Sequence, residues 1–387
     1  MISSLRGRVA VAVGVTALMA GVVGCGADRS GGGSPGERLR QDVEKLHALG
    51  ISGVQARVIG VDGRESVAVA GSADSSTGSP VDPDGYFRMA STSKTLVATV
   101  VLQLAAEGKL GLADTAERWL PGVVRGNGND GSRISIRQLL QHTAGIHDDL
   151  PGYTTAEEYY RQRFDIYDSE QLVARAMTHE PDFAPGTGWA YANTDYVLLG
   201  MIVRQVTGRP VHQEIEERIL KPIGLEQTRW GGTSPGLPEP HARAYQFFGP
   251  DSQVDVTEQV PVDPEVLSWV TTTHDENVFF RALLSGRLLP APQLTEMKNT
   301  VPVAGGLETF WPGGRYGLGL AERPLSCGGS YWGHEGGDGG YITLNGVTGD
   351  GRRSVVVSMS EALGDTPEHI LAQENSASAL IDHALCD

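Results

Sequence analysis

Two side chains three residues apart could carry out nucleophilic catalysis. Ser91 and Lys94 open a segment whose apolar residues keep helical spacing, so on a helix their side chains share one face. A serine hydroxyl is a weak nucleophile until a neighbouring base removes its proton, and an amine can do this. A helix N-terminus also favours negative charge developing on Ser91. The pair predicts a serine nucleophile, with a solvated Ser-Lys pair as the alternative.

A second motif, Tyr191 and Asn193, lies just before an apolar helical pattern over 196–206. Tyr191 could accept the Ser91 proton if the ammonium group of Lys94 lowered the phenol pKa, which is near 10 when unperturbed. The Asn193 amide would hold Lys94 and a substrate carbonyl. A core tyrosine and a capping asparagine remain the alternative.

The third motif is His334, Glu335, Gly336 and Gly337, on a glycine-rich strand where a substrate backbone could approach closely. The backbone N–H groups of Gly337 and Ser91 would form an oxyanion hole, which can be worth ~3 kcal/mol or more. Taken singly, a His-x-Gly triplet is expected by chance.

In this order, the three motifs resemble the S-x-x-K, Y-x-N and H/K-x-G motifs of the serine β-lactamase and penicillin-binding family. Further segments that look like that family's surroundings lie at 87–90, 136–146, 183–200 and 316–320. The resemblance covers about residues 54–360 and is nearest to class C β-lactamases and secreted D-alanyl-D-alanine carboxypeptidases.

The resemblance implies an acyl-enzyme mechanism that needs no cofactor or metal ion. Ser91 would attack a carbonyl, and Lys94 and Tyr191 would shuttle the proton. His334 would take the place of the third motif's cation, coupled to Tyr191. Water would then release the acyl group.

Several residues expected to face the substrate differ from those at the same positions in the carboxypeptidases that this sequence resembles. Glu335 and Gly337 stand where those enzymes carry hydroxyl groups that hold a substrate carboxylate. Ala321 replaces a carboxylate-binding Arg, and Arg323, two residues on, is a candidate to compensate for it. An ionised Glu335 would repel a carboxylate by roughly 3 kcal/mol at about 5 Å and an effective dielectric of 20. We therefore expect Glu335, Gly336 and Gly337 to favour neutral or amine-bearing substrates.

Three function classes follow from these motifs. The first is a D-alanyl-D-alanine carboxypeptidase-like peptidase or amidase of the cell envelope, with the peptidoglycan stem peptide as one candidate substrate. The second is an esterase on the same scaffold. The third is a catalytically silent wall-binding protein. In each case we expect a monomer.

Strand and helix patterns predict the frame that positions these motifs. Strands are expected at 54–61, 65–70, 316–322, 330–334, 341–346 and 354–360, and terminal helices at 37–48 and 367–385. Helical patterns dominate between the two strand-rich ends. We predict an α/β (α+β) fold of the β-lactamase/transpeptidase type: an antiparallel sheet lobe (37–110 and 300–387), covered by the terminal helices, with an inserted mainly helical lobe (111–299).

The first 24 residues have the features of an export signal, because two arginines precede an apolar run over 9–23 that is too short to span a bilayer. The residues before Cys25 match the pattern that a bacterial lipoprotein signal peptidase recognises, so we expect lipidated Cys25 at the mature N-terminus. Ordinary cleavage beside a free cysteine is the alternative. Residues 25–36 would be a flexible tether to a domain over 37–387. The protein is thus expected to be exported and lipid-anchored outside the cell membrane.

The net charge limits the binding partners of the protein, and the cysteines indicate a disulfide. Without the signal the chain has 29 basic and 47 acidic residues, a formal charge of −18, which disfavours binding to nucleic acid or anionic lipid. Cys327 and Cys386 then remain besides Cys25. In an oxidising compartment we expect them to form a disulfide, with two buried thiols as the alternative.

Three other motifs carry competing hypotheses. Residues 232–236 match the G-x-S-x-G nucleophile elbow, but Pro235 lacks the N–H that its oxyanion hole needs. His142 is more typical of a residue that braces a loop than of a triad member. Residues 147–149, His-Asp-Asp, could bind a metal ion but lack a second ligand cluster at metal spacing.

Overall fold

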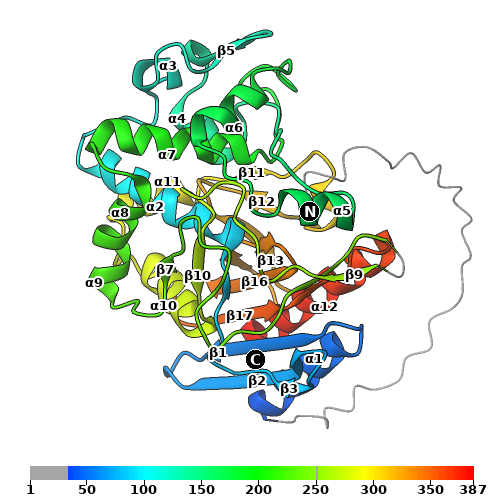
Figure 1. Cartoon of the computed structure of the whole chain (residues 1–387). Coiled ribbons are helices and arrows are strands. Elements are labelled where there is room, and N and C mark those ends of the chain that lie inside the picture. The colour runs from blue at the N-terminus through cyan, green and yellow to red at the C-terminus, as the bar shows by residue number, and fades with distance from the viewer. Residues whose placement is uncertain (1–33, 250–251) are drawn as a thin grey trace, which may run out of the picture.

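The computed structural model describes residues 34–249 and 252–387 as a large antiparallel sheet with helices on both faces and a helical lobe beside it (Figure 1). Every neighbouring pair of strands in this sheet is antiparallel. The predicted sheet with its covering terminal helices and inserted helical lobe is confirmed. Cys25 and the expected signal lie outside the described residues.

The sheet is built from the two ends of the chain, which meet where β17 pairs with β1. In spatial order its strands are β11 (Val301–Pro302), β12 (Arg315–Tyr316), β13 (Ala321–Pro324), β14 (Ser330–Gly333), β16 (Tyr341–Thr348), β17 (Ser354–Met359), β1 (Gly53–Ile59), β2 (Glu65–Asp74) and β3 (Ser79–Pro80), with β15 (Gly336–Asp338) also paired to β16.

Alternation along β1 places different helices on the two faces of the sheet. Val54 and Ala56 pack in one apolar cluster with residues of α1 (Pro35–His47) and α12 (Pro367–Cys386). Arg57, which points the other way, donates to Thr273 at the start of α10 (Thr273–Leu284). The central strands are therefore covered on both faces.

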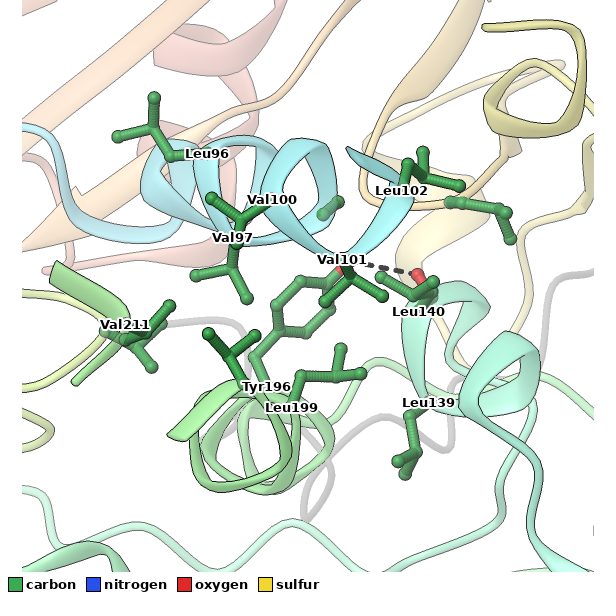
Figure 2. Packing of buried hydrophobic residues seen from close by; sticks show 14 of the residues in the cluster. Leu96, Val97, Val100, Val101, Leu102, Leu139, Leu140, Tyr196, Leu199 and Val211 are labelled. Atoms are coloured by element: carbon green, nitrogen blue, oxygen red, sulfur yellow. Dashed lines mark hydrogen bonds between the residues drawn. The ribbon is translucent and has the colours of Figure 1, made fainter. Parts of the chain in front are cut away.

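The helical lobe packs around α2, which is buried on nearly all sides. In Figure 2, apolar side chains of α2 interlock with those of α4, α7 and α8, and the Tyr196 hydroxyl donates to the Leu140 carbonyl at 2.9 Å. The helices of this region are α2 (Ser93–Ala106), α3 (Ala116–Trp119), α4 (Ile136–Gln141), α5 (Ala156–Gln162), α6 (Ser169–Ala176), α7 (Asn193–Thr207), α8 (Val211–Ile215), α9 (Lys221–Ile223) and α11 (Ala291–Met297).

Short strands form three smaller sheets. They are β4 (Phe87–Arg88), β10 (Trp269–Thr271) and β7 (Arg229–Trp230) in one group, β18 (Glu361–Ala362), β8 (Tyr245–Phe247) and β9 (Gln253–Asp255) in a second, and β5 (Arg125–Gly126) with β6 (Asn129–Asp130). Within the described ranges, no helix combines the length and the apolar character needed to cross a membrane.

Several predicted elements have different bounds in the structure, among them the first helix and the strand expected over 316–322. Helix α1 begins at Pro35, because proline is well suited to a first helical turn, so the last residues of the expected tether are helical. The single strand expected over 316–322 is two strands, β12 and β13. The loop between them closes through a bond from Gly317 N to Leu320 O at 2.8 Å.

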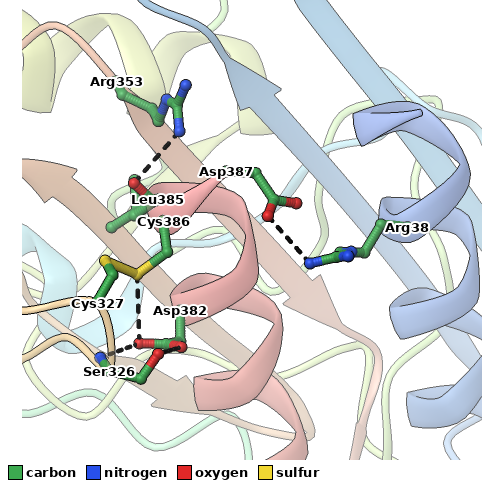
Figure 3. The surroundings of a disulfide bond; sticks show 8 residues. All are labelled: Arg38, Ser326, Cys327, Arg353, Asp382, Leu385, Cys386 and Asp387. Atoms are coloured by element: carbon green, nitrogen blue, oxygen red, sulfur yellow. Dashed lines mark hydrogen bonds and ion pairs between the residues drawn. A yellow bond between two sulfur atoms is a disulfide. The ribbon is translucent and has the colours of Figure 1, made fainter. Parts of the chain in front are cut away.

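Cys327 and Cys386 form a disulfide that fastens the end of α12 to the loop before β14 (Figure 3). Their Cα atoms are 5.8 Å apart. Beside the bond, Asp382 accepts hydrogen bonds from the backbone N and the hydroxyl of Ser326, at 2.7 Å and 2.5 Å. Helix α12 is thereby fixed over the sheet.

Candidate active site

Ser91 lies in a 3-10 turn, Ala90–Thr92, that runs directly into α2. Ala90 has φ of 48°, a left-handed conformation that costs energy for a residue with a Cβ atom and that often marks functional turns. Lys94, in the first turn of α2, places its Nζ 2.9 Å from Ser91 Oγ. The two side chains that the sequence paired are therefore in direct contact.

Lys94 is fully buried, and burial lowers the pKa of its amine from 10.5 to about 7, because an ammonium group loses its hydration there. The nearby carboxylate of Asp148 acts in the opposite direction. Nζ also donates to Asn193 Oδ1 at 2.8 Å and lies 5.0 Å from the centre of the Tyr191 ring. Near neutral pH, a substantial fraction of Lys94 is thus a neutral amine able to accept a proton.

Tyr191 differs from the sequence-based expectation. Burial raises the pKa of its phenol well above 10, and a hydrogen bond to Ser91 only partly opposes this. This is opposite to the lowered phenol pKa that the expected phenolate base required, because burial removes the hydration that stabilises a phenolate. Tyr191 is a neutral hydroxyl that can donate a hydrogen bond beside the nucleophile.

Asp148 holds the second motif in place, a role that the sequence did not reveal. Its Oδ1 accepts from the backbone N of Asn193 at 2.7 Å and of Thr194 at 3.2 Å, and its Oδ2 accepts from Asn193 Nδ2 at 2.9 Å. The carboxylate thus caps α7 and fixes the Asn193 amide with its oxygen toward Lys94. Within the motif at 147–149, Asp148 is the residue that holds Asn193.

His142 lies behind Tyr191 and does more than brace a loop. It ends α4 with φ of 59°, and its ring centre is 4.4 Å from that of Tyr191. Its Nδ1 lies 3.1 Å from Asp195 Oδ2 inside the protein. Burial lowers the pKa of His142 and raises that of Asp195, so this pair is a neutral support for the tyrosine.

His334 is not the cation that the resemblance implied. Burial and the charge of Lys94 lower its pKa to about 3, so the imidazole is neutral. Its Nε2 lies 2.8 Å from the Tyr316 hydroxyl, and its Nδ1 lies 2.7 Å from the Glu335 carbonyl, which can only accept. The proton therefore sits on Nδ1, and Nε2 accepts from Tyr316, so the expected coupling of an imidazolium to Tyr191 is wrong.

The strand β15 presents backbone groups to the nucleophile. Gly339 and Gly340 both have positive φ, 51° and 85°, as a type I′ hairpin turn requires. Such a turn makes Asp338 and Tyr341 the hydrogen-bonded pair, so the next pair, Gly337 and Ile342, is not hydrogen-bonded. The N–H and C=O of Gly337 therefore point away from β16, toward an open strand edge.

Gly336 allows β15 to lie directly against the nucleophile turn. A Cβ atom at Gly336 would be 2.3 Å from the Met89 carbonyl oxygen. On the same side, Thr92 Oγ1 donates to the His334 carbonyl at 2.9 Å. The third motif is thus joined to the first by close backbone contact, which brings Gly337 beside Ser91.

Glu335 is not the free carboxylate that the sequence suggested. Arg323 Nη1 bonds to Glu335 and also donates to Glu374 Oε1 at 3.0 Å. Burial and the neighbouring Glu374 raise the pKa of Glu335, against the influence of Arg323. Arg323 is therefore committed to two protein carboxylates, and the repulsion of about 3 kcal/mol expected from an unpaired Glu335 is an overestimate.

The catalytic residues open into a cleft with a volume of about 320 Å³. Ser91, Tyr191, Asn193, His334 and Gly337 are among the residues that line it. The lining also includes Leu150, Tyr153, Gln246, Gln259, Val262, Phe310, Trp311, Glu335, Asp338, Ile370, Gln373 and Glu374. Apolar walls with a few polar groups are typical of a small-molecule site.

The G-x-S-x-G motif at 232–236 lies apart from this chemistry. Ser234 is exposed in a loop, where its hydroxyl lies 3.4 Å from the Gly236 carbonyl oxygen. Across residues 34–249 and 252–387, no group of three or more metal-binding side chains gathers.

Comparisons with known proteins match most of the chain. The Beta-lactamase family model matches residues 39–380. Esterase EstB of Burkholderia gladioli is 33% identical over 191 residues, which are 44% of this chain and 47% of the relative. A putative D-alanyl-D-alanine carboxypeptidase of Escherichia coli K12 is 29% identical over 238 residues, 60% of this chain and 52% of the relative. The chain spans about half the length of these curated relatives.

Three solved structures match this chain over nearly their whole length. A D-stereospecific amidohydrolase from Streptomyces sp. is 38% identical, with a TM-score of 0.78 over 87% of this chain and 98% of that chain. A D-amino acid amidase from Ochrobactrum anthropi SV3, complexed with D-phenylalanine, is 25% identical, with a TM-score of 0.77 over 91% and 98%. A β-lactamase/D-alanine carboxypeptidase from Pseudomonas syringae, at 19% identity and a TM-score of 0.68, shares the fold. The β-lactamase/transpeptidase-like fold is confirmed.

Proposed function

Because the chain belongs to the Beta-lactamase family, a family of serine hydrolases, we propose that it is an amidohydrolase that forms an acyl-enzyme on Ser91 and acts on small amides or peptides of D-amino acids. The observation that carries this proposal is the contact of 2.9 Å between Ser91 Oγ and a buried Lys94 amine with a pKa of about 7. The 38% identity to a D-stereospecific amidohydrolase, over 98% of that chain, supports the substrate class.

The proposed reaction has two stages. Ser91 Oγ attacks the substrate carbonyl carbon while its proton passes to the neutral Lys94 amine. The N–H groups of Ser91 and Gly337 hold the oxyanion of the tetrahedral intermediate. The C–N bond then breaks, and the leaving amine takes a proton from the Lys94 ammonium through the Tyr191 hydroxyl. Lys94 then takes a proton from a water molecule, which attacks the acyl carbon. The C–O bond to Ser91 breaks, Ser91 Oγ regains a proton from Lys94, and the acid leaves.

Two other activities on the same scaffold, those of an esterase and of a carboxypeptidase, are the alternatives. An esterase is favoured by the match to EstB, although that match covers only 44% of this chain. A carboxypeptidase is favoured by relatives with that name, but Arg323, the cation bonded to Glu335, is already committed to two carboxylates. An ester has a better leaving group than an amide, so ester cleavage alone would not identify the natural substrate.

The test compares the two enantiomers of phenylalanine amide with a simple p-nitrophenyl ester. We expect hydrolysis of D-phenylalanine amide, slow or absent hydrolysis of the L form, and labelling of Ser91 by a fluorophosphonate. Ser91→Ala should abolish hydrolysis and labelling, and Ser234→Ala should leave both within a few-fold. Ester cleavage without amide cleavage would favour the esterase. Absence of labelling would favour a catalytically silent wall-binding protein.

We also propose that the protein acts outside the cell, as a monomer held by a lipid on Cys25. The disulfide between Cys327 and Cys386 supports an oxidising compartment. Metabolic labelling with a fatty acid should mark the wild type and not Cys25→Ser. A soluble, unlabelled mature protein would indicate ordinary cleavage instead.

A further inference from the structure

Three charged side chains bond to one another at the wall of the cleft, and they are named here the Arg323 cluster: Arg323, Glu335 and Glu374. Arg323 Nη1 bonds to both carboxylates, while Nη2 donates to Ser378 Oγ at 2.9 Å and to the Phe310 carbonyl at 3.2 Å. Both Nη atoms of the guanidinium are therefore engaged by protein acceptors. Glu335 and Glu374 line the cleft, whereas Arg323 lies behind them.

The backbone of β15 indicates which part of a substrate reaches this cluster. The sheet is antiparallel throughout, and a substrate that adds to the open edge in the same sense would exchange both of its hydrogen bonds with Gly337. The residue whose carbonyl is attacked then lies opposite Gly337. The next substrate residue, which belongs to the leaving group, lies opposite Gly336 and is followed by Glu335.

From this arrangement, and given the proposed amidohydrolase function, we infer that the Arg323 cluster is a leaving-group subsite that accepts amide or amine N–H donors and rejects a free carboxylate. An ionised carboxylate offers only acceptors, and here it would be the third acid around one guanidinium. An N–H donor from an amide or an amine can instead bond to Glu335.

The walls of the subsite agree with this chemistry. Phe310, Trp311 and Ile370 line the cleft beside Glu335, and the Arg323 guanidinium lies 5.8 Å from the centre of the Trp311 ring. These apolar surfaces exclude water, so a carboxylate entering the subsite would lose hydration without gaining a cation. A neutral amide end, or an amine paired with Glu335, avoids that cost.

The size of the preference follows from the charges. If Glu335 were an unpaired carboxylate about 5 Å from the carboxylate of an acid ligand, at an effective dielectric of 20, it would weaken binding of that ligand about a hundredfold. Because Arg323 is bonded to Glu335, and because a raised pKa reduces the charge on Glu335, we expect a smaller preference for the amide over the acid, on the order of tenfold.

Binding to inactive protein tests the subsite separately from catalysis. D-alanyl-D-alanine and its C-terminal amide are titrated into the Ser91→Ala variant by calorimetry at low and high salt. We expect the amide to bind about tenfold more tightly than the acid, with a smaller ratio at high salt. Adding Glu335→Gln, which keeps an oxygen for Arg323, should reduce the ratio to near one.

Two further variants complete the experiment. Glu374→Gln should reduce the ratio in the same direction, and it replaces Glu335→Gln if that variant does not fold. Glu322→Gln is the matched control, because Glu322 is the neighbour of Arg323 on β13 but accepts from Ser330 Oγ at 2.8 Å instead. It should leave the ratio unchanged.

Two results would overturn the inference: equal or tighter binding of the acid by the Ser91→Ala variant, or an unchanged ratio after both cluster substitutions. Neither result depends on turnover. Wild-type protein that hydrolyses no D-amino-acid amide, while its Ser91→Ala form prefers the amide ligand, would refute the proposed function and leave the subsite standing.

Discussion

Replacing Asp148 by Asn should weaken the site and shift its pH dependence, because one carboxylate supports both Asn193 and Lys94. Its Oδ1 caps α7 through the backbone N of Asn193, and its Oδ2 accepts from the Asn193 side chain at 2.9 Å. Asparagine retains one acceptor oxygen but has no negative charge. The substitution therefore removes one hydrogen bond to a charged group and the charge at the start of a helix.

Two magnitudes follow for this variant. The lost bond and the lost interaction with the helix N-terminus together should lower the free energy of unfolding by about 1–3 kcal/mol. Asn193, no longer fixed, would hold Lys94 less well, and a small displacement of a catalytic group can reduce the rate roughly a hundredfold. Because Asp148 raises the pKa of Lys94, the variant's lysine should lose its proton below pH 7.

The assay is the second-order rate of fluorophosphonate labelling between pH 5 and pH 9, together with urea denaturation. We expect a slower maximal rate and a midpoint at lower pH than in the wild type. Asp149→Asn is the control, because Asp149 pairs with Arg175 at 2.9 Å on the surface and should leave the profile unchanged. A midpoint that stays in place or rises in Asp148→Asn would refute the electrostatic role.

Three further predictions concern separate parts of the molecule. In the wild type, the rate of labelling should rise with pH through one transition near pH 7, as the buried Lys94 loses its proton. His334→Gln should keep that midpoint, because a pKa of about 3 leaves His334 neutral throughout. A shifted midpoint would show that His334 takes part in the proton transfer. Replacing both disulfide cysteines by serine should lower the free energy of unfolding by ~4 kcal/mol, since the bond closes a loop of about 60 residues; an unchanged urea midpoint would contradict this. Gly336→Ala should lower the rate of labelling at least about a hundredfold, because its Cβ would lie 2.3 Å from the backbone oxygen of Met89. Gly337→Ala should lower the rate only a few-fold, because its Cβ would meet a side-chain carbon at 3.1 Å. Equal effects of the two substitutions would contradict the close approach of β15.

The frame of the protein could be predicted from local sequence patterns because its strands and terminal helices have simple periodicity. Apolar residues of α1 recur at 39, 43 and 46, and all three are buried. The hairpin of β1 and β2 turns at Asp62 and Gly63, as expected. The break between β12 and β13 was missed, because the glycines at 317 and 319 were included in a strand although they close a loop.

Charge states in the site could not be predicted, because they depend on burial and on partners distant in sequence. The sequence shows His334 beside Glu335, but not that Tyr316 bonds to the imidazole or that Arg323 bonds to the carboxylate. Asp148 caps a helix that begins 45 residues later, so no local capping pattern marks it. Each correction thus arises from tertiary contacts, which motif spacing does not encode.

The balance around Lys94 explains why a lysine can serve as the base at neutral pH. A solvated lysine, with a pKa near 10.4, would be almost entirely protonated and unable to accept a proton. Complete burial without nearby acids would depress the pKa further and leave a weak base, whereas a base with a pKa near the working pH combines availability with strength. Asp148 contributes most among the charges that oppose the burial of Lys94. Burial raises the pKa of a second neighbour, Asp263, to about 7, so its charge is partly lost under the same conditions. The strength of the base therefore depends chiefly on one carboxylate, which also holds the amide that contacts Lys94.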